Sequence, residues 1–132
     1  MRSMVVVVLA VLAFGAQAEE ESTPCDNVET TEQNYDCVVF NKKTAERELN
    51  AAYDELLDRA KSQYTGNSAQ LTDFTARIKA AQQLWIKLRD ADCAVETFQT
   101  TKGTQDFDMA QNTCLAQRSD ERSEYLQSLG ME

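Results

Sequence analysis

The sequence contains no histidine. Serine and cysteine hydrolases normally use a histidine to carry the proton of the nucleophile, so its absence excludes the common catalytic triads. The four glycines form no phosphate-binding loop, and no calcium loop of the Asp-x-Asp-x-Asp-Gly type is present. These absences predict a protein that is not an enzyme and that uses no cofactor.

Strand signals are also missing, because no segment alternates apolar and polar residues with a period of two. Proline occurs once, at Pro24, so the chain after it is free of the residue that most strongly interrupts helices. The sequence therefore predicts an all-α fold.

The one long apolar run lies at the amino terminus and extends over eleven residues, Met4 to Phe14. It follows Arg2 and precedes Ala16-Gln17-Ala18, the small-x-small pattern of a signal-peptidase site. A spanning helix needs about 20 apolar residues, so we expect a signal peptide over residues 1–18, removed after Ala18. Because Glu19 and not cysteine follows the cut, no lipid anchor is expected, and the protein should be periplasmic or secreted.

The chain behind this cut is strongly acidic. Removal of 18 residues from 132 leaves 114, enough for one domain, and the remaining 12 basic and 22 acidic residues give a formal charge of −10. This charge excludes nucleic acid and anionic membranes as favoured partners, and it would attract a cationic protein. Alternatively, the acidic surface serves only to keep the protein soluble, and the charge taken by itself favours this second interpretation.

Four cysteines, Cys25, Cys37, Cys93 and Cys114, follow the cut. An even number in an exported protein predicts two disulfides. A structural metal site is disfavoured because there is no CxxC pair, no histidine and no short ligand spacing.

Helical periodicity begins at a capping box formed by Thr30 and Gln33, and it predicts a first helix from about Thr31 to Tyr64. Gly66-Asn67-Ser68 supplies a stop and a new N-cap. The apolar face of this first helix recurs every three or four residues: Ala45, Leu49, Ala52, Tyr53, Leu56, Leu57, Ala60 and Tyr64.

A second helix follows, and its apolar stripe extends toward Phe98. The chain is then expected to turn at residues 100–104, and Thr104 caps a third helix that ends near Leu129. The polar middle of the third helix, residues 117–124, predicts weaker packing. The stripe of the second helix comprises Leu71, Phe74, Ile78, Ala81, Trp85, Leu88, Ala91 and Val95.

Short connections favour an antiparallel three-helix bundle in up-down-up order, stapled by two disulfides, over residues 30–130. Residues 19–29 are expected to form a flexible acidic lead-in.

Equal distances from the turns bring Cys93 opposite about residue 39 and Cys114 opposite about residue 89, which gathers the cysteines toward one end. This register favours Cys25 with Cys93 and Cys37 with Cys114, and it leaves the exchanged partners open. Pairing of Cys25 with Cys37 is the least favoured, because the lead-in would have to fold back.

Carboxylates are frequent on the predicted helices, notably Asp54, Glu55 and Asp58 on the first and Asp90 with Asp92 on the second. Such spacing on an amphipathic helix usually marks its solvated face. Trp85, the only tryptophan, lies on the apolar stripe and is expected in the core. Arg89 is expected to form a structural ion pair with a carboxylate of the first helix or with a helix terminus.

The segment Gln82-Gln83-Leu84-Trp85-Ile86-Lys87-Leu88-Arg89-Asp90-Ala91-Asp92-Cys93 resembles the signature A-Q-x-x-W-[IL]-x-[FYL]-R-D-x-x-C of the lysozyme inhibitor LprI-like family of bacterial exported proteins. Further landmarks agree in order and spacing over nearly the whole exported chain. They are the early cysteines with Thr30 and Thr31, the run Leu49-Asn50-x-x-Tyr53, and Cys114 followed by Arg122.

The resemblance implies a helical, disulfide-bonded envelope protein that inhibits lysozyme. The motif residues Leu49, Asn50, Tyr53, Gln82, Trp85, Arg89, Asp90 and Arg122 are interpreted as structural. Contact with lysozyme or another cationic wall hydrolase is assigned to exposed carboxylates such as Asp54, Glu55 and Asp58. The alternative is a structural or interaction module of the bacterial envelope with a different protein partner.

Overall fold

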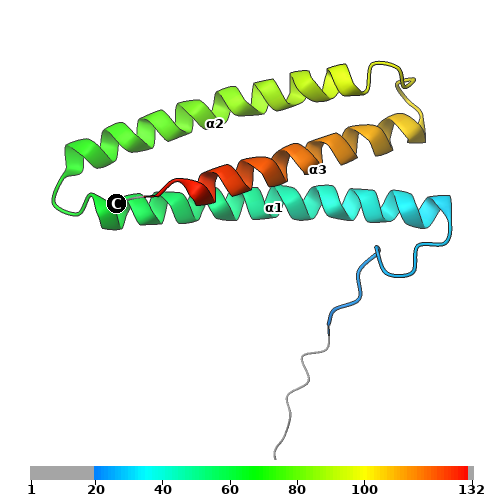
Figure 1. Cartoon of the computed structure of the whole chain (residues 1–132), viewed down its shortest axis with the longest axis horizontal. Helices are drawn as coiled ribbons and strands as arrows, with labels where there is room; N and C mark the ends of the chain where they lie inside the picture. The colour runs from blue at the N-terminus through cyan, green and yellow to red at the C-terminus, as the bar shows by residue number, and fades with distance from the viewer. Residues whose placement is uncertain (1–19, 131–132) are drawn as a thin grey trace, which may run out of the picture.

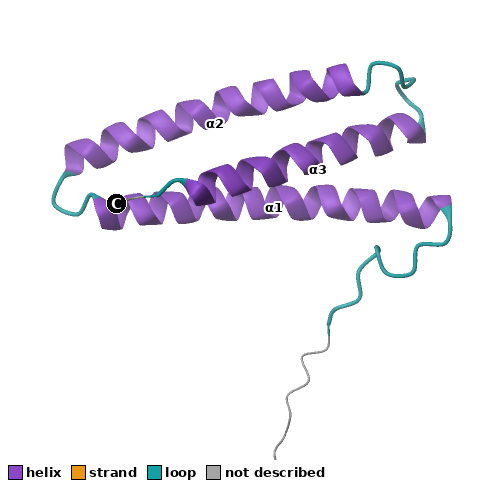
Figure 2. Ribbon diagram, in the orientation of Figure 1, coloured by secondary structure: helices purple, strands orange, loops and turns teal. Residues whose placement is uncertain are grey.

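The computed structural model describes residues 20–130, so the expected signal peptide, residues 1–18, lies outside the described residues. The described part consists of three helices and contains no strand: α1 (Thr31–Gln63), α2 (Ser68–Glu96) and α3 (Gln105–Ser128). The helices run up, down and up along one long axis (Figures 1 and 2). The prediction of an all-α three-helix bundle is confirmed.

Side-chain caps fix where the helices begin. The backbone N–H of Gln33 donates to Thr30 Oγ1 at 3.1 Å, and the N–H of Thr30 donates back to Gln33 Oε1 at 3.1 Å, which completes the expected capping box of α1. The side chains of Asn67 and Thr104 cap α2 and α3 by accepting from the backbone N–H groups of Gln70 and Phe107. Gly66 and Gly103 precede these caps with φ of 82° and 83°, a left-handed conformation that glycine adopts without strain.

The core lies mainly between α1 and α3, which converge toward the carboxyl end of α3 (Figure 1). Most of its contact positions carry small side chains, and small side chains let two helix backbones approach closely. The buried residues of α1 are Ala45, Leu49, Ala52, Leu56 and Ala60, and those of α3 are Cys114, Ser119, Ser123 and Leu126.

The expectation that the polar middle of α3 packs weakly is wrong. Ser119 is fully buried and Ser123 is nearly so, and the Ser123 hydroxyl donates to the carbonyl oxygen of Ser119 at 3.0 Å. The acidic residues beside them, such as Asp120 and Glu124, remain exposed. The small size of the two serines decides this contact, because the Ser123 hydroxyl is satisfied within its own helix and the Ser119 hydroxyl is buried without a partner.

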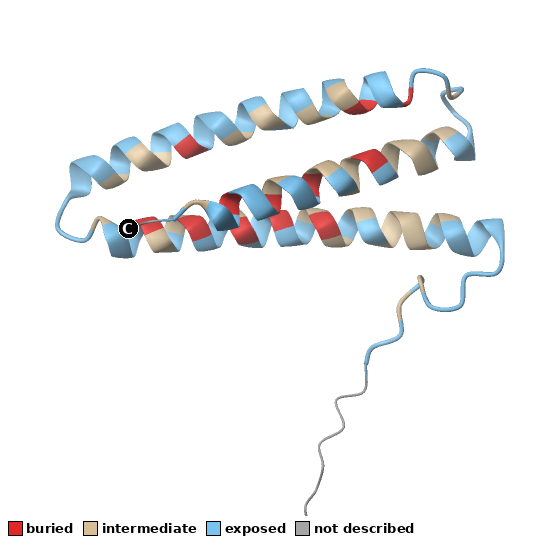
Figure 3. Ribbon diagram, in the orientation of Figure 1, coloured by how far each residue is buried: buried red, intermediate tan, exposed pale blue. Residues whose placement is uncertain are grey.

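Helix α2 is the loosely packed one, and only Ile78 and Cys93 on it are buried (Figure 3). Leu88, Val95 and Phe98 were expected on its buried stripe, but 59%, 75% and 85% of their surfaces are exposed. A seven-residue spacing drifts by about 20° per heptad around a straight helix, so this row turns gradually away from the core.

The disulfides join Cys25 with Cys37 and Cys93 with Cys114, with Cα atoms 4.6 and 5.7 Å apart. The favoured pairing of Cys25 with Cys93 and of Cys37 with Cys114 is therefore wrong. The lead-in does fold back, because a turn in which the Asp26 N–H bonds the Thr23 carbonyl, at 3.1 Å, directs Cys25 onto the side of α1. The second disulfide joins α2 to α3.

Both disulfides still lie at one end of the bundle, where α1 begins and α2 ends, as the cysteine register predicted (Figure 1). A crosslink between α2 and α3 compensates for the small buried face of α2, since each disulfide stabilises a fold by about 2 to 4 kcal/mol.

Enlarging one small contact residue should separate α1 from α3. We predict that Ala52→Leu, at a position 1% exposed, lowers the free energy of unfolding by about 1 to 3 kcal/mol because the core cannot take three more carbons. Ala51→Leu is the control, since Ala51 is exposed and the same change there should cost less than about 0.5 kcal/mol. Urea unfolding of both variants measures the difference, and equal losses would contradict the close contact.

Candidate functional site

A groove follows the contact between α1 and α3 on the outside of the bundle. It consists of three adjoining hollows: two, of about 390 and 460 Å³, are lined by both helices, and the third, of about 630 Å³, is lined by α1 residues. The first two share Glu48, Asp120 and Glu124 as lining residues, and Glu55 lines both the second and the third. We call this continuous surface the acidic groove.

Six carboxylates line the acidic groove: Glu48, Glu55, Asp58, Asp120, Glu121 and Glu124. Asp58 pairs with Lys61 at 3.5 Å, and Glu121 pairs with Arg118 at 3.2 Å. Within residues 20–130, the other four form no ion pair. The groove thus presents negative charge that the described part of the chain does not neutralise.

The helix periods place these carboxylates beside the core. On α1, Glu48 and Glu55 are seven residues apart and flank the buried row that contains Ala52. On α3, Asp120 and Glu124 are four residues apart and flank the buried Ser123. Since residues four and seven apart share a helix face, the two acidic rows face each other across a floor of small side chains.

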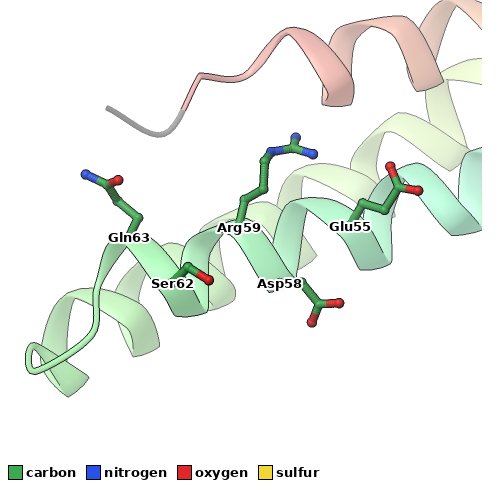
Figure 4. A pocket seen from close by; sticks show the side chains of 5 residues that line it. All are labelled: Glu55, Asp58, Arg59, Ser62 and Gln63. Carbon is green, nitrogen blue, oxygen red and sulfur yellow. The ribbon is translucent and has the colours of Figure 1, made fainter.

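Arg59 is the one cationic side chain that lines the described groove, and it is committed elsewhere. Its Nη2 donates to the carbonyl oxygen of Leu126 at 2.9 Å, close to the end of α3. Arginine commonly binds carbonyls in the last turn of a helix. Figure 4 shows Glu55 and Arg59 on the side of α1 nearer α3, with Asp58 directed away from it.

The structure places the three predicted contact residues differently. Glu55 and Asp58 line the acidic groove, whereas Asp54 is exposed and lines none of its hollows. Glu48 and the acidic residues of α3 were not predicted as contact residues. The polar middle of α3 marked the acidic residues of that helix, but it was interpreted only as a sign of weak packing.

The family-signature residues gather in a second place, between α2 and α3. The Trp85 ring lies under two guanidinium groups, with Arg89 at 5.3 Å and Arg122 at 5.6 Å from its centroid. Arg122 also lies 4.8 Å from the Tyr125 ring, and its Nε donates to Gln82 Oε1 at 3.0 Å. We call Gln82, Trp85, Arg89, Arg122 and Tyr125 the arginine–aromatic cluster.

Arg122 contacts two rings and an amide, and none of these partners is a carboxylate. Burial lowers the pKa of the Arg122 guanidinium, and its Nη2 is buried without a hydrogen-bond partner. Arg89 was expected to pair with the first helix or with a helix terminus, but it pairs with its neighbour Asp90 at 2.8 Å. That expectation is wrong because the Arg89 side chain lies along the Trp85 ring of its own helix.

The remaining signature residues are divided between core and surface. Leu49 is buried in the core cluster, and Tyr53 and Trp85 pack against that cluster. Asn50 is exposed. The arginine–aromatic cluster and these core contacts join α2 to the α1–α3 pair, and the structural role of the motif residues remains a prediction.

The described residues contain no group of three or more histidine, cysteine, aspartate or glutamate side chains placed to hold a metal ion. In the same part of the chain, no helix combines the length and the hydropathy needed to cross a membrane.

Comparison with known proteins gives the family. A family model described as "Lysozyme inhibitor LprI" matches residues 25–126, from the first cysteine to the end of the α1–α3 contact. The chain belongs to this family. The expected domain limits of 30–130 remain a prediction.

A crystal structure of a DUF1311 family protein from Pseudomonas putida KT2440 is similar to this chain, with 50% sequence identity and a TM-score of 0.69. The match covers 78% of this chain and 96% of the other. No protein of curated function matches the chain.

Arg122, which lies in the arginine–aromatic cluster, should contribute more to stability than Arg77, which lies outside it. Arg122→Ala should lower the free energy of unfolding by about 1 kcal/mol, because the Gln82 hydrogen bond and the contacts with two rings are lost. Arg77→Ala should have little effect, because Arg77 forms an exposed ion pair with Asp73. Equilibrium unfolding followed by Trp85 fluorescence compares them, and a larger loss for Arg77→Ala would refute the assignment.

Proposed function

We propose that this LprI-family protein inhibits a lysozyme or a related cationic wall hydrolase by binding it through the acidic groove. The single observation that carries the proposal is the set of four exposed carboxylates, Glu48, Glu55, Asp120 and Glu124, that have no ion pair within residues 20–130. The family description supplies the class of target.

The groove suits basic side chains of a partner. A lysine or arginine that enters between Glu55 and Glu124 meets carboxylates from both helices, and the two small side chains below, Ala52 and Ser123, leave room for its stem. Hydrogen bonds between charged groups are stronger than those between neutral ones, and a guanidinium can bind a carboxylate with two N–H groups.

Long-range attraction supports the same assignment. A formal charge of −10 after removal of residues 1–18 draws a cationic protein toward the molecule before contact, and the groove concentrates part of that charge on one side. Inhibition of this kind should weaken as salt rises, because ions screen the attraction between exposed charges. We place this binding in the periplasm or outside the cell, after removal of residues 1–18.

Binding rather than turnover suits the chemistry of the groove. Its carboxylates are solvent-exposed, and the chain has no histidine to move a proton between a nucleophile and a leaving group. An exposed carboxylate is a good hydrogen-bond and ion-pair partner for a cationic side chain.

A cell-wall lysis assay with the purified, oxidised protein tests the proposal. The native chain should slow a cationic lysozyme in low salt, and the Glu55→Gln, Glu124→Gln variant should need about tenfold more protein for the same effect, since two charged contacts are lost. The control is Glu20→Gln, Glu21→Gln, which removes equal charge from the lead-in and should retain most of the inhibition.

Three outcomes would oppose this account in different ways. No inhibition at several-fold molar excess in low salt would reject lysozyme as the target. Equal weakening by the groove variant and the lead-in variant would show attraction by net charge without a binding groove. Recovery of another envelope protein from a periplasmic pull-down, with no lysozyme, would favour the alternative of an envelope interaction module.

A further inference from the structure

Helix α2 exposes an apolar row beside the face that packs on the other helices. We call it the outer stripe: Ala81, Leu84, Leu88, Ala91, Val95 and Phe98. Leu84 and Leu88 are 66% and 59% exposed, and Val95 and Phe98 are 75% and 85% exposed. Figure 1 shows α1 and α3 on one side of α2 and nothing on the other.

The outer stripe has the spacing of a coiled-coil seam. Its members alternate steps of three and four residues from Ala81 to Phe98, so they occupy successive a and d positions of a heptad. All six residues of the outer stripe are uncharged. The stripe does not continue before Ala81, because the next position of the pattern is Arg77, which pairs with Asp73 at 3.0 Å.

We propose that the outer stripe is the interface of a weak parallel dimer, in which the α2 helices of two copies pack side by side about a two-fold axis. An interface between identical copies uses the same patch twice, and a straight row of a and d residues is complementary to itself in this way. The inference is independent of the proposed function, because the stripe and the acidic groove share no residue.

Charge at the edges of the stripe favours a second copy and the parallel direction. Lys87 occupies a g position and Asp92 the e position five residues later, and within residues 20–130 neither forms an ion pair. In a parallel pair, each g residue faces the e residue five positions on in the partner, so Lys87 would meet Asp92 of the other copy twice. In an antiparallel pair, g positions lie beside g positions and e positions beside e positions, so Lys87 and Asp92 would lie on opposite edges of the interface and could not pair.

The other edge positions carry no charge and add no repulsion. They are Ala80, Trp85, Ala94 and Gln99. A dimer through this face therefore leaves every acidic side chain of the groove exposed, and it joins two strongly acidic molecules along a surface that has no excess of negative charge.

The size of the stripe sets the strength of the dimer. Its four large side chains, one aromatic and three aliphatic, offer on the order of 500 Å² per chain, because an aromatic side chain buries roughly 150 to 250 Å² and an aliphatic one less. Two faces together would bury about 1,000 Å², which lies at the lower limit of specific interfaces. The dimer should therefore be reversible and depend on concentration.

Sedimentation equilibrium of the purified, oxidised protein from about 10 µM to 1 mM tests the proposal. The average mass should rise toward that of two chains. Leu88→Glu should keep the protein monomeric over the whole range, whereas Gln83→Glu, which adds the same charge at an exposed position outside the stripe, should leave dimerisation unchanged. Circular dichroism checks that both variants remain helical, which is expected because Leu88 is exposed.

Charge exchange tests the direction of pairing. Lys87→Asp alone should weaken association about fivefold, because symmetry removes two ion pairs, and Lys87→Asp with Asp92→Lys should restore it.

A monomeric native protein at 1 mM would overturn the proposal, as would association that survives Leu88→Glu. Failure of the double exchange to restore pairing would overturn the parallel arrangement. Loss of lysozyme inhibition in Leu88→Glu, with the native chain monomeric, would assign the stripe to the hydrolase.

Discussion

The close approach of α1 and α3 is the constraint on which the rest of the molecule depends. Alanines at positions 45, 52 and 60 and serines at positions 119 and 123 provide it, because none of them holds the helix backbones apart. Leu49, Leu56 and Leu126 fill the space that remains. With so few large buried side chains, the hydrophobic gain is modest for a chain of this length, which explains why two disulfides and the arginine–aromatic cluster assist the fold.

Two exposed surfaces follow from this constraint. Where two helices touch through small residues, the long side chains beside the contact converge, and on this chain those side chains are mostly carboxylates such as Glu55 and Glu124. The same pairing leaves α2 with little of its surface covered, so its outer row from Ala81 to Phe98 is free. One side of the molecule is therefore acidic and grooved, and another is apolar and convex.

Much of the fold was predictable because its signals are local. The caps at Thr30, Asn67 and Thr104 and the three-and-four spacing of apolar residues depend on neighbours within one helical turn. Disulfide pairing was not predictable, because it depended on one turn before α1 that brings Cys25 back to Cys37. Only the α1 side of the groove was predicted, through Glu55 and Asp58. The α3 side was missed because the polar middle of α3 predicted weak packing, whereas Ser119 and Ser123 are small enough to be buried.

The account centres on a cationic partner held between α1 and α3. Hydrogen–deuterium exchange of the protein with and without a cationic lysozyme tests this claim most directly. The account predicts slower exchange in residues 48–63 of α1 and residues 116–127 of α3, with residues 81–98 of α2 unchanged at concentrations where the chain is monomeric. Protection confined to α2, or saturating binding that leaves α1 and α3 unprotected, would contradict it.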